Sequence, residues 1–439
     1  SSTRRHPRFG FKSRGLGDVY KRQVIVRLEL SPGTGLQSAV LPSFQPAVIR
    51  QIVTPMRNRL DHAPPSMLHP PMSRPIETPL VAQLSATVPF VGPEAIERVR
   101  GTSFAARIGA NESVFGPSPK VIEAIKNAAP EAWMYGDPEN HELRHALSAY
   151  LNVAPDEVVV GEGVDALLGY VVRIFAGPGD HVVTSDGAYP TFNYHVAGYG
   201  ASLTKVPYKD DKEDPEALLK AASDTGAKLI YLANPDNPMG SWHGAGVIDD
   251  MIADLPSGCL LILDEAYAEF APTDAVPILN TENPQVIRMR TFSKAFGLAG
   301  LRVGYAIGER GVIRSFEKIR NHFGMNRISQ AAALAALSDL DWLETVKRNV
   351  ADSRARIASI ATQNGLLPLP SATNFVTIDC RRDSAYAKAI LDHLVGQGVF
   401  VRMPFAEPGN RCIRISCGTD TDLDLFEGAL PIALAETGG

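Results

Sequence analysis

Short apolar stretches alternate with helix-length segments of mixed polarity between residues 155 and 310. The short stretches are rich in aliphatic residues, as is typical of strands buried on both faces, and segments such as "GVDALLGYVVRIFA" space their apolar residues as a helix does. The predicted strands are 157–160, 181–185, 203–207, 228–233, 259–264, 286–290 and 301–307. This alternation predicts an α/β fold with a mostly parallel seven-stranded sheet flanked by helices, whose ligands bind at the carboxyl ends of the strands.

The pattern changes after residue 310. A helix-rich stretch is followed by the strand-like "NFVTI", the helix "AYAKAILDHLVGQG" and two further strand-like runs, "VFVRM" and "RCIRIS". We therefore predict a large domain over 131–335 and a smaller α+β domain over 336–439. Residues 88–130 are assigned to the smaller domain by the family resemblance described below.

The first 87 residues have a different composition from the rest. Residues 1–60 contain 11 of the 43 Lys and Arg residues but only two of the 48 acidic ones, and a Pro-rich segment follows. We expect residues 1–87 to lack a packed fold. They are either an organelle transit peptide or, as we favour, upstream sequence translated in frame before a natural start near Met72.

Charge and cysteine content exclude several functions. Without its basic first residues the chain is acidic, which argues against nucleic-acid binding. No apolar run approaches the roughly 18 residues that span a bilayer, so no membrane association is predicted. The four cysteines form no CxxC pair, so we expect neither a metal site nor a disulfide framework, and we predict a cytoplasmic location.

Polar residues follow several predicted strands. "GEGVDALL" places the amides of Val164 and Asp165 at a helix start, where they suit an anion. "NPDNPMG" presents the amide of Asn237, Asp264 ends an apolar strand, and Lys294 follows another. Each of these alone has a plainer interpretation as a turn, a helix cap or a surface lysine. Together they offer groups for a phosphate, a heteroaromatic ring and an aldehyde, the set that pyridoxal phosphate requires.

Several longer motifs carry a resemblance to a known family. In chain order they are "GANESVFGPSPKV", "YGDPENHELRHAL", "GEGVDALL", "AYPTF", "NPDNPMG", "DEAY", "TFSKAFGLAGLRVGY" and "RISCGT". On these motifs, residues 88–435 resemble a fold-type I pyridoxal-phosphate-dependent aminotransferase of class I/II, most like the histidinol-phosphate aminotransferase branch.

The resemblance implies roles at the cofactor ring. Lys294 would bind pyridoxal 5'-phosphate as a Schiff base and transfer the proton at the substrate Cα. Asp264 would pair with the pyridinium nitrogen, and Asn237 and Tyr267 would hydrogen-bond the ring's phenolate oxygen. Phe192 would stack on the ring.

Other implied roles concern the cofactor phosphate, the substrate and a second subunit. The phosphate would be held by the amides of Val164 and Asp165 and by the side chains of Thr291, Ser293 and Arg302. Arg414 would bind the substrate carboxylate, or the phosphate of a phosphorylated donor, and Asn111 and Glu112 would lie near the substrate. Tyr135 would reach the cofactor of a neighbouring subunit, which implies a homodimer.

Departures from the family pattern leave the substrate open. Met239 replaces a common Thr, Val164 a common Ser and Ala166 a common acidic residue, and "NHFGMNRISQ" lacks an expected Pro. The resemblance implies ping-pong transfer between an L-amino compound, either histidinol phosphate or an aromatic or other amino acid, and a 2-oxo acid such as 2-oxoglutarate. The alternatives are a pyridoxal-phosphate lyase or decarboxylase of the threonine-phosphate decarboxylase type, a DNA-binding regulator with an aminotransferase-like domain, and a non-catalytic binding protein.

Overall fold

The computed structural model describes residues 74–86 and 91–438. The disorder expected for residues 1–87 therefore concerns a region that lies largely outside the described residues, as does the DNA-binding module that a regulator would need there. Within the described residues, no helix is long and apolar enough to cross a membrane.

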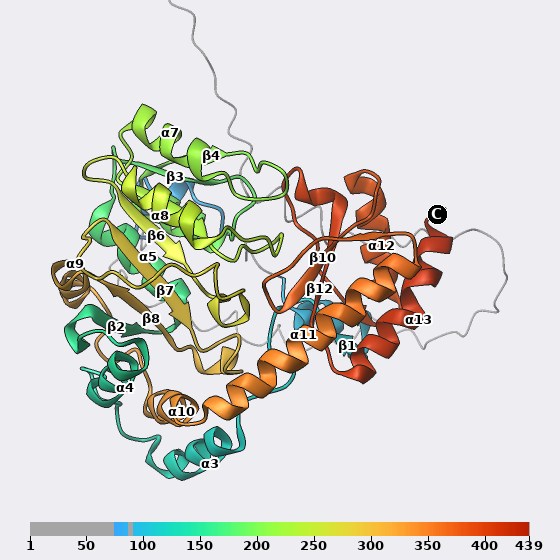
Figure 1. Cartoon of the computed structure of the whole chain (residues 1–439), viewed down its shortest axis with the longest axis horizontal. Helices are drawn as coiled ribbons and strands as arrows, with labels where there is room; N and C mark the ends of the chain where they lie inside the picture. Colours follow the sequence, from blue (N-terminus) through green and yellow to red (C-terminus); the bar gives the residue numbers. More distant parts are fainter. Residues whose placement is uncertain (1–73, 87–90, 439) are drawn as a thin grey trace, which may run out of the picture.

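The larger sheet has seven strands in the order β2-β8-β7-β6-β5-β3-β4, and only β8 runs antiparallel to its neighbours (Figure 1). The fold class predicted from the sequence is confirmed. The strands are β2 (Val158–Gly161), β3 (His181–Ser185), β4 (Ser202–Val206), β5 (Leu229–Ala233), β6 (Leu260–Asp264), β7 (Val286–Thr291) and β8 (Gly304–Gly308).

One strand begins later than its sequence suggests. We predicted 301–307, but Ala299–Leu301 form a 3-10 turn and Arg302 has a φ of 55°. A left-handed residue cannot continue a strand, so β8 begins at Gly304 despite the apolar residues before it.

Helices cover both faces of this sheet. Along β5, alternate residues point to opposite sides, as the two-residue period of a strand requires. Leu229 and Tyr231 pack with α5 (Gly163–Phe175), α6 (Thr191–Tyr199) and α9 (Arg310–Ser315). Ile230 and Leu232 pack with α7 (Pro215–Thr225) and α8 (Ala245–Ala253). An apolar layer therefore covers each face of this sheet, and a third apolar cluster extends from β2 and β8 into the rest of the described structure.

The remaining strands belong to a second, smaller body (Figure 1). Its antiparallel sheet has the order β12-β10-β9, and β1 pairs in parallel with β11. These strands are β1 (Ala106–Arg107), β9 (Leu367–Pro368), β10 (Phe375–Asp379), β11 (Val399–Phe400) and β12 (Cys412–Ser416). The other α-helices are α2 (Pro93–Arg100), α3 (Pro119–Ala128), α4 (His141–Leu151), α10 (Arg327–Leu337), α11 (Leu340–Gln363), α12 (Ser384–Gly396) and α13 (Asp420–Glu436).

The two bodies are joined by the long helix α11, which runs from beside α10 to the smaller sheet (Figure 1). The early part of the chain contributes to both, because β1 pairs with β11 while α3 packs on α10. The domain boundaries near residues 131 and 336 stay predictions.

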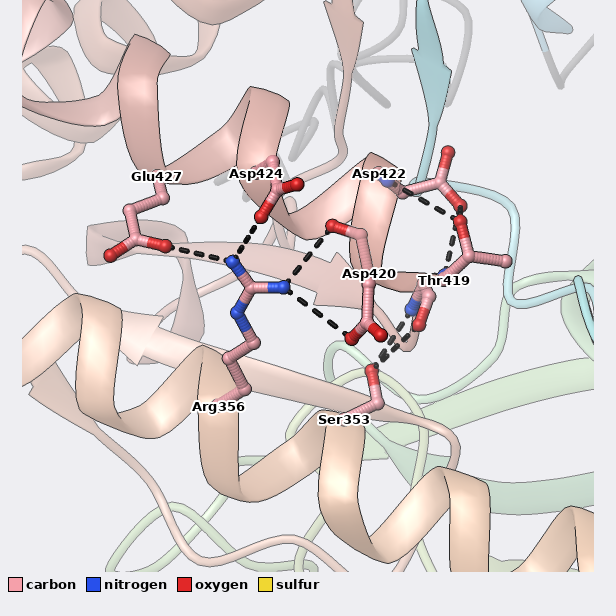
Figure 2. Close-up of polar contacts among 8 residues, drawn as sticks. Ser353, Arg356, Thr419, Asp420, Asp422, Asp424 and Glu427 are labelled. Carbon is pink, nitrogen blue, oxygen red and sulfur yellow. Dashed lines mark hydrogen bonds and ion pairs between the residues drawn. The ribbon is translucent and has the colours of Figure 1, made fainter.

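Polar contacts attach α13 to α11 directly after strand β12 (Figure 2). Ser353 hydrogen-bonds both the amide and the carbonyl of Gly418, and Thr419 caps α13 by accepting from the amide of Asp422. Arg356 binds acidic residues on the first turns of α13, namely Asp420, Asp424 and Glu427. These contacts fix the end of the strand that carries Arg414.

Candidate active site

A cavity of about 480 Å³ opens at the carboxyl ends of β5, β6 and β7 and is completed by residues 402–405 and 414 of the smaller body. Most of the residues singled out in the sequence line it. They are Asn111, Glu112, Val164, Asp165, Asn237, Asp264, Tyr267, Thr291, Ser293, Lys294, Arg302 and Arg414. This is the position that an α/β sheet predicts for a ligand.

Lys294 lies in the loop after β7 and is partly buried in the cavity wall. Its Nζ donates to the carbonyl of Asn111 at 3.1 Å and lies 5.5 Å from the centre of the Tyr267 ring. Burial, followed by the charge of Arg414, lowers the pKa of this amine to about 8. A substantial fraction is therefore unprotonated near neutral pH, as a nucleophile requires.

Asp264 ends β6 and is buried. Its Oδ2 accepts from the hydroxyl of Tyr231 at 2.8 Å, and its Oδ1 accepts from the amide of Ala266 at 3.0 Å. Burial raises the pKa of this carboxyl, whereas both hydrogen bonds and the nearby Lys294 oppose that rise. A cationic ligand atom in the cavity would stabilise the carboxylate further.

Asn111 connects the two bodies beneath the cavity. Its Nδ2 donates to the hydroxyl of Tyr267 at 3.2 Å, and its Oδ1 accepts from Ser416 at 2.8 Å. The backbone carbonyl of Asn111 also accepts from Lys294. Asn111 therefore holds both the phenol of Tyr267 and the amine of Lys294. Asn237, from the loop after β5, accepts a hydrogen bond from Arg414 through its Oδ1.

The start of α5 forms a cradle suited to an anion. The first amides of a helix lack partners within the helix, and they point toward its N-terminal end. Gly163 has a φ of 83°, and a Cβ built on it would lie 2.6 Å from Arg302 Nη2. A Cβ on Gly304 would lie 2.7 Å from the amide nitrogen of Val164. Only glycine at these two positions lets the guanidinium and the amide lie where they do.

Two hydroxyls lie beside this cradle, at the end of β7. Thr291 Oγ1 donates to Ser293 Oγ at 2.9 Å and accepts from the amide of Ser293 at 3.0 Å. Amides, hydroxyls and a guanidinium thus surround one end of the cavity, which is the donor set that a phosphate needs.

Arginines line the substrate side of the cavity. Arg414 donates from Nη2 to the carbonyl of Gly109 at 3.1 Å, and its guanidinium lies 5.1 Å from the centre of the Phe375 ring. Its backbone pairs with that of Arg402, which also lines the cavity. We did not predict Arg402, although its place in "VFVRM", antiparallel to the strand of Arg414, could have indicated it.

The prediction that Phe192 stacks on the cofactor ring is wrong, because this residue does not line the cavity. Its ring is buried in the core and stacks on Tyr231, with 4.8 Å between ring centres and 18° between planes. Phe192 is the second residue of α6, and the helix turns its side chain toward α5 and the sheet. Tyr189, three residues earlier in the same motif, lines the cavity instead.

Tyr135 lies away from the cavity of its own chain and is 77% exposed. Its ring contacts Phe323 at 5.0 Å between centres, and Trp133 nearby in the sequence is also exposed. A single chain therefore leaves Tyr135 outside the site that it was expected to reach.

Two aromatic residues near the cavity were missed. Tyr231 is buried within a strand, where a purely apolar side chain would fill the core equally well. Its hydroxyl was therefore the feature of the sequence that could have indicated a polar partner at the site. Tyr189 was quoted within "AYPTF", but local sequence does not say which of its two rings faces a ligand.

The fold and the cavity are those of an aminotransferase. Residues 106–430 match the family described as aminotransferase class I and II, and the chain belongs to this family. A histidinol-phosphate aminotransferase from Roseiflexus castenholzii is 37% identical over 352 residues, which cover 77% of this chain and 93% of that protein. Histidinol-phosphate aminotransferase 2 from Pseudomonas aeruginosa is 35% identical over 363 residues, covering 81% and 97%.

Solved structures agree with this assignment. Histidinol-phosphate aminotransferase from Sinorhizobium meliloti, in complex with pyridoxal-5'-phosphate, has a TM-score of 0.81 at 53% identity and covers 83% of this chain and 99% of its own. Aspartate aminotransferase from Thermus thermophilus, with maleate, shares the fold at a TM-score of 0.68 and 22% identity, covering 78% and 94%. The predicted family is confirmed, with its pyridoxal-phosphate-dependent aminotransferase activity, and the lyase alternative is not favoured.

Proposed function

We propose that this aminotransferase moves the amino group of histidinol phosphate to 2-oxoglutarate in two half-reactions. The observation that carries the proposal is the backbone pairing of Arg402 with Arg414, both of which line the cavity. One cradle suits the cofactor's phosphate, and the two arginines offer a second anion site for a substrate. The names of the relatives point to the same donor.

The residues fit pyridoxal phosphate. Its phosphate would take the amides of Val164 and Asp165 and the side chains of Thr291, Ser293 and Arg302. The glycine positions at 163 and 304 favour this cradle, because a Cβ at either would occupy it. Asp264 would hold the ring nitrogen, and Asn237 and Tyr267 would hold the ring oxygen. Bound there, the cofactor supplies an electron-withdrawing ring that stabilises negative charge at the substrate Cα.

The protein's own groups then carry the proton chemistry. Lys294 Nζ, as a free amine, would remove the proton from the substrate Cα, and the ammonium so formed would then donate that proton as a general acid. Its lowered pKa favours the free amine at the start of this step. The hydrogen bonds from Tyr231 and Ala266 favour the carboxylate form of Asp264, which would hold a proton on the ring nitrogen.

Both substrates would share one arginine. Arg414 suits the side-chain or main carboxylate of glutamate and 2-oxoglutarate, whereas the phosphate of histidinol phosphate would use Arg402 as well as Arg414. A phosphate monoester carries close to two negative charges at neutral pH and so gains more from two guanidinium groups than a carboxylate does.

We infer that the active unit is a homodimer located in the cytoplasm. Trp133, Tyr135 and Phe323 are exposed aromatic residues, the rings of Tyr135 and Phe323 are in contact, and Tyr135 does not line the cavity of its own chain. Aromatic residues of this kind are enriched in the centres of protein interfaces. A second copy packed there would let Tyr135 reach the neighbouring cofactor's phosphate.

The donor profile of the purified enzyme tests the substrate. We expect kcat/KM for histidinol phosphate to exceed that for unphosphorylated histidinol at least about 100-fold, because the phosphate contributes charge-assisted hydrogen bonds. Arg402→Ala should remove most of this difference while changing kcat/KM for histidinol by less than about threefold. An enzyme that prefers an aromatic amino acid to histidinol phosphate would contradict the proposed donor.

A further inference from the structure

Two carboxyl groups are buried behind the loop that carries Asn237. Glu213, just before α7, and Asp236, in the loop 234–241 after β5, are each only 2% exposed. Neither belongs to the cavity lining, and neither has a part in the chemistry proposed above. Two buried carboxylates side by side would be strongly destabilising if both were ionised.

Each of the two carboxyl groups accepts two hydrogen bonds from neutral donors of the protein. Glu213 accepts from the hydroxyl of Ser185 at 2.6 Å and from the amide of Ala233 at 2.9 Å. Asp236 accepts from the hydroxyl of Tyr208 at 2.9 Å and from the amide of Met239 at 3.0 Å. The negative charge of Asp236 also raises the pKa of Glu213, so the two carboxyl groups interact. All four donors are neutral, so two buried negative charges would stay uncompensated, and a proton on one of the carboxyl groups removes that penalty.

The same loop makes the contacts that join the smaller body to the cavity. Asn237 Oδ1 accepts from Arg414, the carbonyl of Pro238 accepts from Thr377 Oγ1 at 2.6 Å, and the carbonyl of Gly240 accepts from the amide of Ala372 at 2.9 Å. Within the loop, the amide of Asp236 donates to the carbonyl of Ser241 at 2.8 Å. A movement of Asp236 would therefore displace Asn237, which is the hydrogen-bond partner of Arg414.

We propose that Glu213 and Asp236 are a positioning pair that shares one proton and carries one negative charge, and that holds loop 234–241 so that Asn237 and Arg414 face the ligand. The roles of Asn237 and Arg414 rest on the proposed function. The pair is not catalytic, because it touches neither substrate nor reacting atoms; it acts through the loop.

The surroundings of the pair support this charge state. The titratable and charged groups that face it are Tyr208, Tyr231, His243, Asp264 and Arg414. Burial raises the pKa of Glu213 well above its usual range, so Glu213 is the member that keeps the proton. Burial also raises the pKa of Asp236, to about 7, against the hydrogen bonds from Met239 and Tyr208 and the charge of Arg414.

Infrared spectroscopy of the holoenzyme tests the shared proton. At about pH 8, the spectrum should contain the carbonyl stretch of a protonated carboxyl group, and Glu213→Gln should remove it. The control is Asp214→Asn, which changes the neighbouring carboxylate at the cap of α7 and should leave the band in place. A wild-type spectrum without such a band at this pH would overturn the proposal even if the variants failed to fold.

Steady-state kinetics test the positioning role. Asp236→Asn should raise the KM for 2-oxoglutarate about tenfold while kcat changes less than about threefold, because a hydrogen-bonded charge that orients the binding groups is lost. Glu213→Gln should raise KM less than Asp236→Asn does, since Gln is neutral like the protonated Glu213 that it replaces. Asp214→Asn should match the wild type.

The kinetic outcomes separate two kinds of failure. If Asp236→Asn lowered kcat and left KM unchanged, or had no effect, the positioning role would be wrong. If the wild-type enzyme did not transaminate at all, the proposed function would fail, and the infrared band would still decide whether the pair holds one proton.

Discussion

The amine of Lys294 is the side chain on which turnover should depend most. Lys294→Ala should lower kcat at least about 1000-fold, because no other amine lines the cavity among the described residues. The fold should persist, since the amine makes a single hydrogen bond, to the carbonyl of Asn111. Steady-state rates and circular dichroism would check both expectations. Turnover at about a tenth of the wild-type rate would contradict the role of Lys294.

The lowered pKa of Lys294 predicts a pH dependence. Attachment of pyridoxal phosphate to the apoprotein should become faster as the pH rises from about 7, and should level off above the pKa of about 8. Because this pKa lies below the value in an unfolded chain, the native state binds the proton more weakly. Lys294 therefore destabilises the apoprotein below about pH 8, and this penalty fades as the pH rises toward 10.5. Stopped-flow absorbance would give the midpoint, and a midpoint near 10.5 would contradict burial of the amine.

At the scale of single residues, the sequence predicted the chemistry better than the orientation of side chains. Asp264 is the last residue of β6 and Lys294 follows the end of β7, so the parallel sheet brings both to one edge whatever the details of the loops. The choice between Tyr189 and Phe192 depends on how α6 begins, which is decided by packing against α5 and Tyr231. Local sequence carries no record of that packing.

The N-terminal turn of α5 gives a prediction at the scale of elements. Gly163→Ala should weaken cofactor binding at least about tenfold, since the methyl group would clash with Arg302 and the residue would be strained at a φ of 83°. Gly198→Ala in α6 is a matched control, because its Cβ would meet no atom within 4 Å. Cofactor titration by fluorescence would measure both. Equal affinities in the two variants would show that the turn does not hold the phosphate.

The elements themselves were largely predictable. Buried strands such as β5 and β6 are continuous apolar runs, and the helices between them keep a clear helical spacing. The start of β8 was not predictable, because a 3-10 turn and the left-handed Arg302 interrupt an apolar stretch that reads as a strand. The side chain of Arg302 also packs against Gly163, which lies far away in the sequence.

At the scale of the whole molecule, the exposed Tyr135 predicts shared active sites. Lys294→Ala and Tyr135→Ala homodimers should each be impaired, the second at least about tenfold. In a hybrid of the two chains, one site would combine a normal Lys294 with a normal Tyr135 from its neighbour. An equal mixture refolded together should therefore recover roughly a quarter of the wild-type activity. Recovery no greater than the sum of the two parent activities would place Tyr135 outside the neighbouring site.

The most direct test of the proposed half-reaction is a visible absorbance spectrum. Protein purified with pyridoxal phosphate is measured before and after the addition of excess L-glutamate, with no 2-oxo acid present. We expect the band of the cofactor bound to Lys294 to give way to that of pyridoxamine phosphate, and 2-oxoglutarate to restore it. A band that glutamate leaves unchanged would contradict amino transfer from this donor, and the absence of any band would contradict the assignment of Lys294.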